Sequence, residues 1–290
     1  MKKSRKLATL GICSILILGL AACQQQHATS EGTNQRQTSS SKVPWKASYT
    51  NLNNQVSTEE VKSLLSANLD PNSVNAFFNL VNDYNTIVGS TGLSGDFTSF
   101  THTEYDVGKI SHLWNQKKGD FVGTNCRINS YCLLKNSVTI PKLEKNDQLL
   151  FLDNDAIDKG KVFDSQDKEE FDILFSRVPT EATTDVKVHA EKMEKFFSQF
   201  QFNDKARMLS VVLHDNLDGE YLFVGHVGVL VPADDGFLFV EKLTFEEPYQ
   251  AIKFASKEDC YKYLGTKYED YTGDGLAKPF IMDNDKWVNL

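Results

Sequence analysis

Hydrophobic residues recur every three or four positions between residues 57 and 200, the spacing of one face of an α-helix. Ser57-Thr58-Glu59-Glu60 is a capping-box signal before one such run. Pro71 stands where a second helix would begin, and Gly89 where it would end. The spacing predicts helices over 57–69, 71–89, 107–117, 126–135, 168–177 and 185–200.

The pattern changes after residue 207 to runs rich in Val, Leu and Phe, which are typical of buried strands. Runs at 208–213, 221–231 and 237–245 are separated by the turn signals Asp218-Gly219 and Asp235-Gly236, so they predict an antiparallel meander. A last helix is expected over 257–268 and an edge strand over 280–288. Helices followed by antiparallel strands predict an α+β fold, with the N-terminal helices packed on an antiparallel sheet.

The first 22 residues carry an export pattern. Four basic residues precede an apolar run at 7–20 that is too short to remain as a membrane span, and the run closes on Leu20-Ala21-Ala22-Cys23. We therefore expect residues 1–22 to be a lipoprotein signal peptide that is cleaved before Cys23. Lipidation of Cys23 would anchor an extracytoplasmic protein to the cytoplasmic membrane. A plain secretory peptide with Cys23 unmodified is the alternative.

Residues 23–48 are mostly polar and predict a flexible tether, followed by a single α+β domain at 49–290. The chain holds 31 basic and 39 acidic residues, a net charge of −8, and loss of the basic export segment would make the remainder more acidic. This charge disfavours nucleic acid as a partner. It also means that the lipid, and not attraction to anionic headgroups, would hold the protein at the membrane.

Candidate chemistry begins at Gly123-Thr124-Asn125-Cys126-Arg127, where a loop runs into a predicted helix. A Cys at a helix N-terminus lies near unpaired amides and the positive end of the helix dipole, which lower the thiol pKa. Cys126 is therefore the candidate nucleophile. Its amide, together with the side chain of Asn125, is the candidate oxyanion site.

The candidate base is His226, in Gly225-His226-Val227-Gly228-Val229 on a predicted central strand. Gly228 shares its face, so we expect space above the imidazole. A four-residue loop at 232–235 would place His226 directly opposite Glu241 on the next strand, close enough for the carboxylate to orient the imidazole. A five-residue loop would place Lys242 there instead.

A Cys nucleophile, a His base and an orienting Glu have the roles of a thiol-hydrolase triad. Over residues 120–243 the sequence resembles the papain-like fold in its NlpC-type bacterial form, in which the Cys opens a helix and a His-Val-Gly-Val strand follows. It differs at the nucleophile, where that family commonly has Asp-Cys-Ser-Gly. The resemblance implies a peptidase or amidase, and the expected location suggests cell-wall peptide or protein as substrate. No cofactor or metal is expected.

The whole chain more closely resembles an uncharacterised family of Gram-positive lipoproteins, the domain of unknown function numbered 4300, which is marked by an Asn-Cys-Arg motif. Asn125-Cys126-Arg127 matches that motif. The resemblance supports the choice of Cys126 and assigns no activity.

Several alternatives stay open from the sequence. Cys126 or Cys132 could form a disulfide with Cys260, and His214 could be a competing base. Two acidic stretches, 153–155 and 270–275, lack the spacing of a calcium loop and are expected to be solvated turns. The alternative function is that of a non-catalytic envelope lipoprotein that binds a peptide, glycan or protein partner.

Overall fold

The computed structural model describes residues 46–101 and 103–290. The predicted signal peptide, the lipidation candidate Cys23 and nearly all of the predicted tether lie outside these residues. Within the described ranges, none of the helices combines the length and apolarity needed to cross a membrane.

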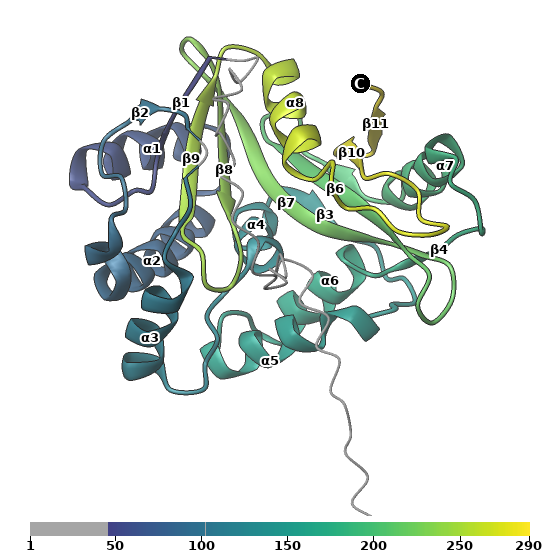
Figure 1. Cartoon of the computed structure of the whole chain (residues 1–290), viewed down its shortest axis with the longest axis horizontal. Coiled ribbons are helices and arrows are strands. Elements are labelled where there is room, and N and C mark those ends of the chain that lie inside the picture. The colour runs from purple at the N-terminus through teal and green to yellow at the C-terminus, as the bar shows by residue number, and fades with distance from the viewer. Residues whose placement is uncertain (1–45, 102) are drawn as a thin grey trace, which may run out of the picture. The chain divides into compact units, whose positions relative to one another are not determined.

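Nine of the described strands form one antiparallel sheet (Figure 1). Its main path runs β11-β10-β6-β7-β8-β9-β1-β2, and β4 pairs with the start of β7. The strands of this sheet are β1 (Ala47–Thr50), β2 (Thr98–Ser99), β4 (Val178–Pro179), β6 (Arg207–Asp215), β7 (Tyr221–Ala233), β8 (Gly236–Lys242), β9 (Tyr249–Phe254), β10 (Phe280–Asp283) and β11 (Lys286–Val288). A separate pair consists of β3 (Val138–Thr139) and β5 (Gln201–Phe202).

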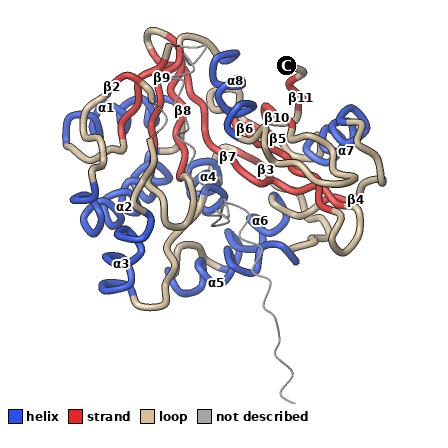
Figure 2. Tube along the Cα trace, in the orientation of Figure 1, coloured by secondary structure: helices blue, strands red, loops and turns tan. Residues whose placement is uncertain are grey.

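Eight α-helices accompany the sheet in the described part of the chain (Figure 2). They are α1 (Gln55–Asn68), α2 (Pro71–Val88), α3 (Val107–Lys118), α4 (Cys126–Leu134), α5 (Phe151–Gly160), α6 (Ser165–Leu174), α7 (Val186–Phe197) and α8 (Lys257–Lys267). Most begin at a side chain that accepts a hydrogen bond from the first turn, as Asp70 does for α2 and Asn125 for α4.

The sheet separates two apolar clusters, because side chains alternate between the faces of each strand. The larger cluster joins Val227 and Val229 of β7 to α1, α2 and α4. The smaller one joins Leu230 and Phe239 to α8. The two strands that carry the candidate His and Glu therefore lie between α4 on one face and α8 on the other.

The predicted α+β class, with helices on an antiparallel sheet, is confirmed. Three details differ. The first helix begins at Gln55, because Asn54 caps it by accepting from the Ser57 amide. The predicted edge strand is a hairpin of β10 and β11, with β11 at the edge. The sequence analysis missed α5, β1 and β9.

The pairing of β7 with β8 corrects the predicted register. A two-residue turn at 234–235 pairs Ala233 with Gly236, so Val229 lies opposite Val240, and continuing that register brings Glu241 opposite Gly228. The expected direct pairing of His226 with Glu241 was wrong by two residues. Because side chains alternate with a period of two, the shift leaves both on one face as diagonal neighbours.

On its other side β7 pairs with β6, and this pairing has a β-bulge next to His226. Val211 of β6 pairs with His226 and Val212 pairs with Val224, which leaves Gly225 as the additional residue. A Cβ at Gly225 would lie 2.2 Å from Leu213 Cδ1, so the close approach of β6 requires glycine there.

Candidate active site

Cys126 is the first residue of α4 and is 4% exposed. Asn125 caps the helix: its Oδ1 accepts from the Ile128 amide at 3.1 Å, and its carbonyl accepts from the Asn129 amide. The amide of Cys126 has no carbonyl of the same helix to donate to, because it lies in the first turn. The thiol is thus held at the positive end of the helix dipole.

His226 and Glu241 form a completely buried pair beside this helix end. His226 Nε2 lies 2.5 Å from Glu241 Oε2, and both side chains have no solvent exposure. The carboxylate accepts the Nε2 proton, which leaves Nδ1 as the nitrogen available to accept one. That Nδ1 is buried, and it is the ring nitrogen left for the Cys126 thiol, which interacts with this imidazole.

The ionisation of the three groups is coupled. Burial opposes thiolate formation at Cys126, but the charge of His226, its hydrogen bonding and the nearby Arg127 outweigh burial and lower the pKa of Cys126. Burial also opposes imidazolium formation, yet Cys126 and Glu241 together raise the pKa of His226. The arrangement therefore favours a thiolate–imidazolium pair.

Cys126 differs from the two other described cysteines in the direction of its pKa shift. All three are buried and free, so the disulfides considered from the sequence are not formed. Burial raises the pKa of Cys132 to about 12 and that of Cys260 well above the ordinary thiol value. Among the described cysteines, only Cys126 has a lowered pKa.

Both neighbours of Cys126 in the Asn-Cys-Arg motif bind Asp153 of α5. Arg127 donates to Asp153 through Nε at 2.9 Å and Nη2 at 2.7 Å, and Asn125 Nδ2 donates to the same carboxylate at 2.7 Å. Asp153 is fully buried. The interpretation of 153–155 as a solvated turn was wrong, because this carboxylate is an internal anchor for the start of α4.

Arg127 also connects α4 to the bulge on β7. Its Nη1 donates to the Val224 carbonyl at 2.9 Å, one residue before the additional Gly225. The Arg127 guanidinium therefore connects α4, which carries the nucleophile, to Asp153 of α5 and to β7, which carries the base. A planar group with several fixed donors suits this task, and Lys would not replace it.

Glu241 is held from the other face of the sheet by α8. Tyr263 donates a short hydrogen bond to Oε1, and Lys267 Nζ lies 3.2 Å from each carboxylate oxygen. Although burial opposes ionisation, Lys267, His226 and Tyr263 lower the pKa of Glu241 to about 2. Tyr268 stacks on the His226 ring, with centroids 5.2 Å apart. The sequence analysis placed these residues on a helix but had no signal for their contacts.

Lys242, the alternative partner of His226, points to the opposite face of β8. Its Nζ donates to the carbonyls of Thr244, Phe245 and Glu247 and lies 4.1 Å from the Tyr84 ring centroid. Burial lowers the pKa of Lys242 to about 7. Its contacts make it the internal support of the loop between β8 and β9.

Asn125, the oxyanion candidate, caps α4 through Oδ1, and its Nδ2 donates one hydrogen to Asp153. One further expectation requires correction. Gly228 was expected to leave space above the imidazole, but a Cβ there would lie 2.3 Å from Phe239 Cζ, so the aromatic ring occupies that space.

His214, the competing base, is committed elsewhere. Its Nε2 lies 2.7 Å from Glu220 Oε2, and its Nδ1 accepts from the Ala277 amide. Both ring nitrogens are therefore used in structural hydrogen bonds.

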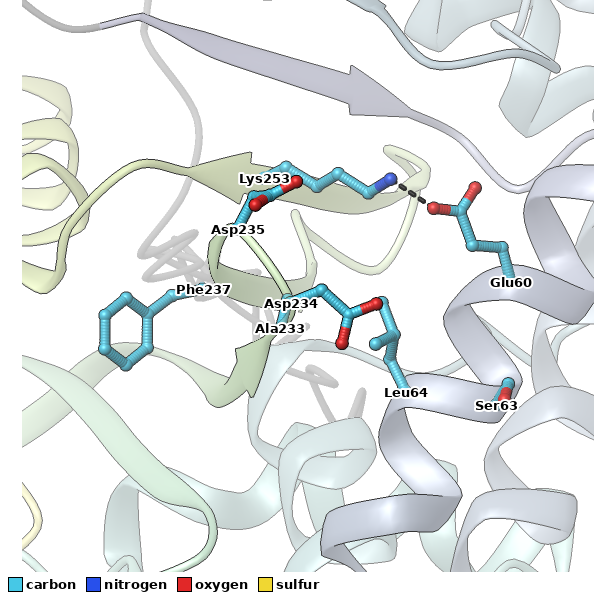
Figure 3. A pocket seen from close by; sticks show the side chains of 8 residues that line it. All are labelled: Glu60, Ser63, Leu64, Ala233, Asp234, Asp235, Phe237 and Lys253. Carbon is cyan, nitrogen blue, oxygen red and sulfur yellow. Dashed lines mark hydrogen bonds and ion pairs between the residues drawn. The ribbon is translucent and has the colours of Figure 1, made fainter.

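A cavity of about 390 Å³ lies beside the turn between β7 and β8, where β8 begins (Figure 3). It is lined by the β7–β8 turn and α1, and Lys253 forms an ion pair with Glu60 across it. A second cavity of about 160 Å³ lies between α2, α3, Val122 and the β8–β9 loop. In the described part of the chain, no group of three or more His, Cys, Asp or Glu side chains is arranged to hold a metal ion.

Comparison with protein families gives one match. The profile described as Domain of unknown function (DUF4300) matches residues 48–288, which is most of the chain. The chain belongs to this family. Searches of curated proteins and of solved structures find no match. In this DUF4300 protein, the Cys126, His226 and Glu241 arrangement has the chemical parts for nucleophilic catalysis: a thiol of lowered pKa, a neighbouring base and a carboxylate that fixes the base.

Proposed function

We propose that this protein is a lipid-anchored, extracytoplasmic cysteine hydrolase that cleaves a peptide or amide bond at the cell envelope. The observation that carries the proposal is the lowered pKa of Cys126 beside His226, whose other nitrogen is held by Glu241 at 2.5 Å. The Leu20-Ala21-Ala22-Cys23 signal supports the location. A papain-like arrangement is part of the proposal, supported by a Cys at a helix start beside a His on an antiparallel strand.

Catalysis would begin from the thiolate–imidazolium pair, in which His226 Nδ1 holds the Cys126 proton, when Sγ attacks the amide carbonyl carbon. The new C–S bond gives a tetrahedral oxyanion, which the Cys126 amide stabilises. The C–N bond then breaks, and the imidazolium gives its proton to the leaving amine. Water, deprotonated by His226, attacks the thioester carbonyl. The C–S bond breaks to release a carboxylic acid, and the proton returns to the thiolate.

Glu241 acts through His226. By accepting the Nε2 proton it keeps Nδ1 facing the thiol, and its charge stabilises the imidazolium that forms in each half-reaction. Tyr263 and Lys267 hold that carboxylate in its ionised form.

Reaction of the thiols with iodoacetamide between pH 5 and 9 tests the proposal. The labelled cysteine is identified by mass spectrometry. We expect rapid labelling of Cys126 with an apparent pKa well below the ordinary value of about 8.5, and loss of that behaviour in His226→Ala. Cys132 provides an internal control, because it is buried with a raised pKa. Labelling of Cys126 no faster than Cys132, or independent of His226, contradicts the proposal.

A second candidate is a non-catalytic envelope lipoprotein that binds a peptide, glycan or protein partner. It is favoured by one observation: Cys126 is 4% exposed, and His226 and Glu241 have no exposure. This candidate predicts that Cys126→Ala preserves binding and that the wild-type thiol is unreactive, so the same labelling experiment separates the two functions.

A further inference from the structure

The smaller of the two cavities lies beside the segment that leads into the nucleophile. It has a volume of about 160 Å³, and its walls come from α2, α3, Val122 and the loop between β8 and β9. A cavity of roughly 150 Å³ accepts a benzene ring, so this one has room for a single side chain. The residues that form its apolar wall and its acidic edge are Tyr84, Ile110, Trp114, Val122, Phe245 and Glu246.

The cavity wall is connected to Cys126 by a short length of chain. A Cβ on Gly123 would lie 3.3 Å from Trp114 Cζ2 and 3.4 Å from the Phe245 carbonyl, so Gly123 packs directly on two residues of the wall. Cys126 is the third residue after Gly123, which limits the distance between their Cα atoms to about 11 Å. A substrate side chain one or two residues from the reacting amide spans that distance.

Lys242 provides a second connection between the cavity wall and Cys126. Its ammonium lies over the Tyr84 ring and binds the Phe245 carbonyl, and it is also close enough to Cys126 for the two charges to interact. The Tyr84 hydroxyl donates to the Glu246 carbonyl. The β8–β9 loop that forms one side of the cavity is therefore fixed from within the protein, so this wall is formed before a ligand binds.

The acidic group at the edge of the cavity is Glu246, and two cations, Lys118 and Lys242, lie near its aromatic wall. Glu246 is exposed and forms no ion pair among the described residues, so its carboxylate is available at the cavity edge. The nearby Lys118 is 5.5 Å from the Trp114 ring, but Asp83 pairs with it at 2.7 Å. Aromatic faces and an unpaired carboxylate together suit a side chain with an apolar stem and a positive tip.

We propose that this cavity is the specificity pocket of the amide substrate and that it binds a lysine-like side chain, with the aliphatic stem along the wall that contains Ile110 and Trp114 and the ammonium at Glu246. The proposal rests on the proposed hydrolase function, because Cys126 defines where the reacting amide lies.

Three chloromethyl ketones test the preference: Nα-acetyl derivatives of lysine, norleucine and glutamate. In each, the thiolate displaces chloride from the methylene carbon, so a C–S bond forms and a C–Cl bond breaks. Rates at Cys126 are divided by the iodoacetamide rate, which removes differences in thiol reactivity. We expect the lysine probe to react about fivefold faster than the norleucine probe, the gain that one exposed ion pair supplies, and the glutamate probe to be slowest.

Substitutions on the loop identify the source of the preference. Glu246→Gln is expected to reduce the lysine-to-norleucine ratio to about one, while the iodoacetamide rate stays within about twofold of wild type. Glu247→Gln is the matched control, because it removes the same charge from the next residue, whose side chain does not line the cavity. Equal rates for lysine and norleucine in the wild type, or an equal loss of preference in both variants, overturn the pocket assignment.

A binding measurement separates failure of the pocket from failure of the hydrolase. Nα-acetyl-lysine methylamide is added to ¹⁵N-labelled Cys126→Ala protein while the Trp114 indole resonance is followed. This indole donates to the Phe121 carbonyl at 2.6 Å, so it reports from the cavity wall. We expect saturable shifts that weaken about fivefold in the Cys126→Ala, Glu246→Gln double variant. Shifts without activated labelling would retain the pocket and reject the hydrolase, whereas activated labelling without shifts would reject the pocket.

Discussion

Replacement of Glu241 by Gln tests whether the buried carboxylate controls the reactivity of Cys126. The substitution preserves the size of the side chain and leaves an oxygen that can accept the His226 Nε2 proton at the present 2.5 Å contact. It removes the negative charge. A change in thiol chemistry would therefore report the electrostatic effect of Glu241 and not the loss of its hydrogen bond to His226. The amide NH2 of Gln would take the place of the oxygen that accepts from Tyr263 and Lys267.

The size of the effect follows from Coulomb's law. Unit charges about 4 Å apart interact by about 4 kcal/mol at an effective dielectric constant of about 20, which corresponds to about three pKa units as an upper limit. Two factors reduce it. Lys267, at 3.2 Å from each oxygen, already neutralises part of the carboxylate, and the same negative charge repels the Cys126 thiolate. We therefore expect the apparent pKa of Cys126 to rise by about one to two units.

The assay is the rate of iodoacetamide labelling at Cys126 as a function of pH. Because each pKa unit changes the thiolate population tenfold at pH values below the pKa, Glu241→Gln should lower the rate about 10- to 100-fold at any pH below the wild-type apparent pKa and preserve the rate near pH 10. Urea denaturation of both proteins establishes that the variant is folded at each pH.

Glu220→Gln is a matched control. Glu220 also pairs with a histidine, His214, at 2.7 Å, and it is partly exposed, so its loss should leave the Cys126 profile unchanged. An unchanged profile in Glu241→Gln would refute the electrostatic role. A parallel drop in rate at every pH would refute it too, since that result indicates loss of access or geometry.

Three other substitutions or conditions give independent checks. Asp153→Asn removes the fully buried carboxylate that pairs with Arg127, whose side chain is 13% exposed, so the free energy of unfolding in urea should fall by about 3–5 kcal/mol. A loss under about 1 kcal/mol would show that the pair is dispensable. The pKa of Glu241 is lowered from 4.5 to about 2, so its ionised form stabilises the folded protein by about 3 kcal/mol above about pH 4.5, and this stabilisation is lost as the pH falls through about 2. If the free energy of unfolding of Glu241→Gln depends on pH in the same way as that of the wild type, Glu241 is not the origin of this pH dependence. Gly228→Ala places a Cβ 2.3 Å from Phe239 Cζ and should lower the free energy of unfolding by about 1–3 kcal/mol, and an unchanged melting temperature would show that the ring has room to move.

The sequence pattern was sufficient for the fold class and for the two strands beneath the site, because both depend on periodicity. It was not sufficient for the register of β7 and β8, which depends on the turn: the chain uses two residues at 234–235, not four. The contact between the His226 and Glu241 side chains is nevertheless present, for a physical reason. An even shift keeps every side chain on its face, and a diagonal neighbour remains within reach of a long side chain.

The parts of the site that escaped prediction depend on contacts between segments distant in the sequence. Asp153 lies 26 residues from Arg127, and its neighbours 154 and 155 are polar, so the local pattern indicated a turn. Tyr263 and Lys267 lie on one face of α8, one turn apart, which is also the pattern of an ordinary amphipathic helix. Only the packing of α8 over β8 brings both to Glu241.

These contacts give a physical role to Asn125 and Arg127, the two residues that flank Cys126. A nucleophile at a helix start requires a fixed rotation of that helix, because turning it by one residue would move the thiol away from His226 by about 100°. Asn125 and Arg127 prevent such a rotation, since they hold the buried Asp153 from both sides of Cys126. By donating to the Val224 carbonyl, Arg127 also fixes the position of α4 along its axis relative to the β7 bulge. Asn125 and Arg127 therefore act as positioning residues. Replacing either of them should separate the thiol from the imidazole before it affects the rest of the fold.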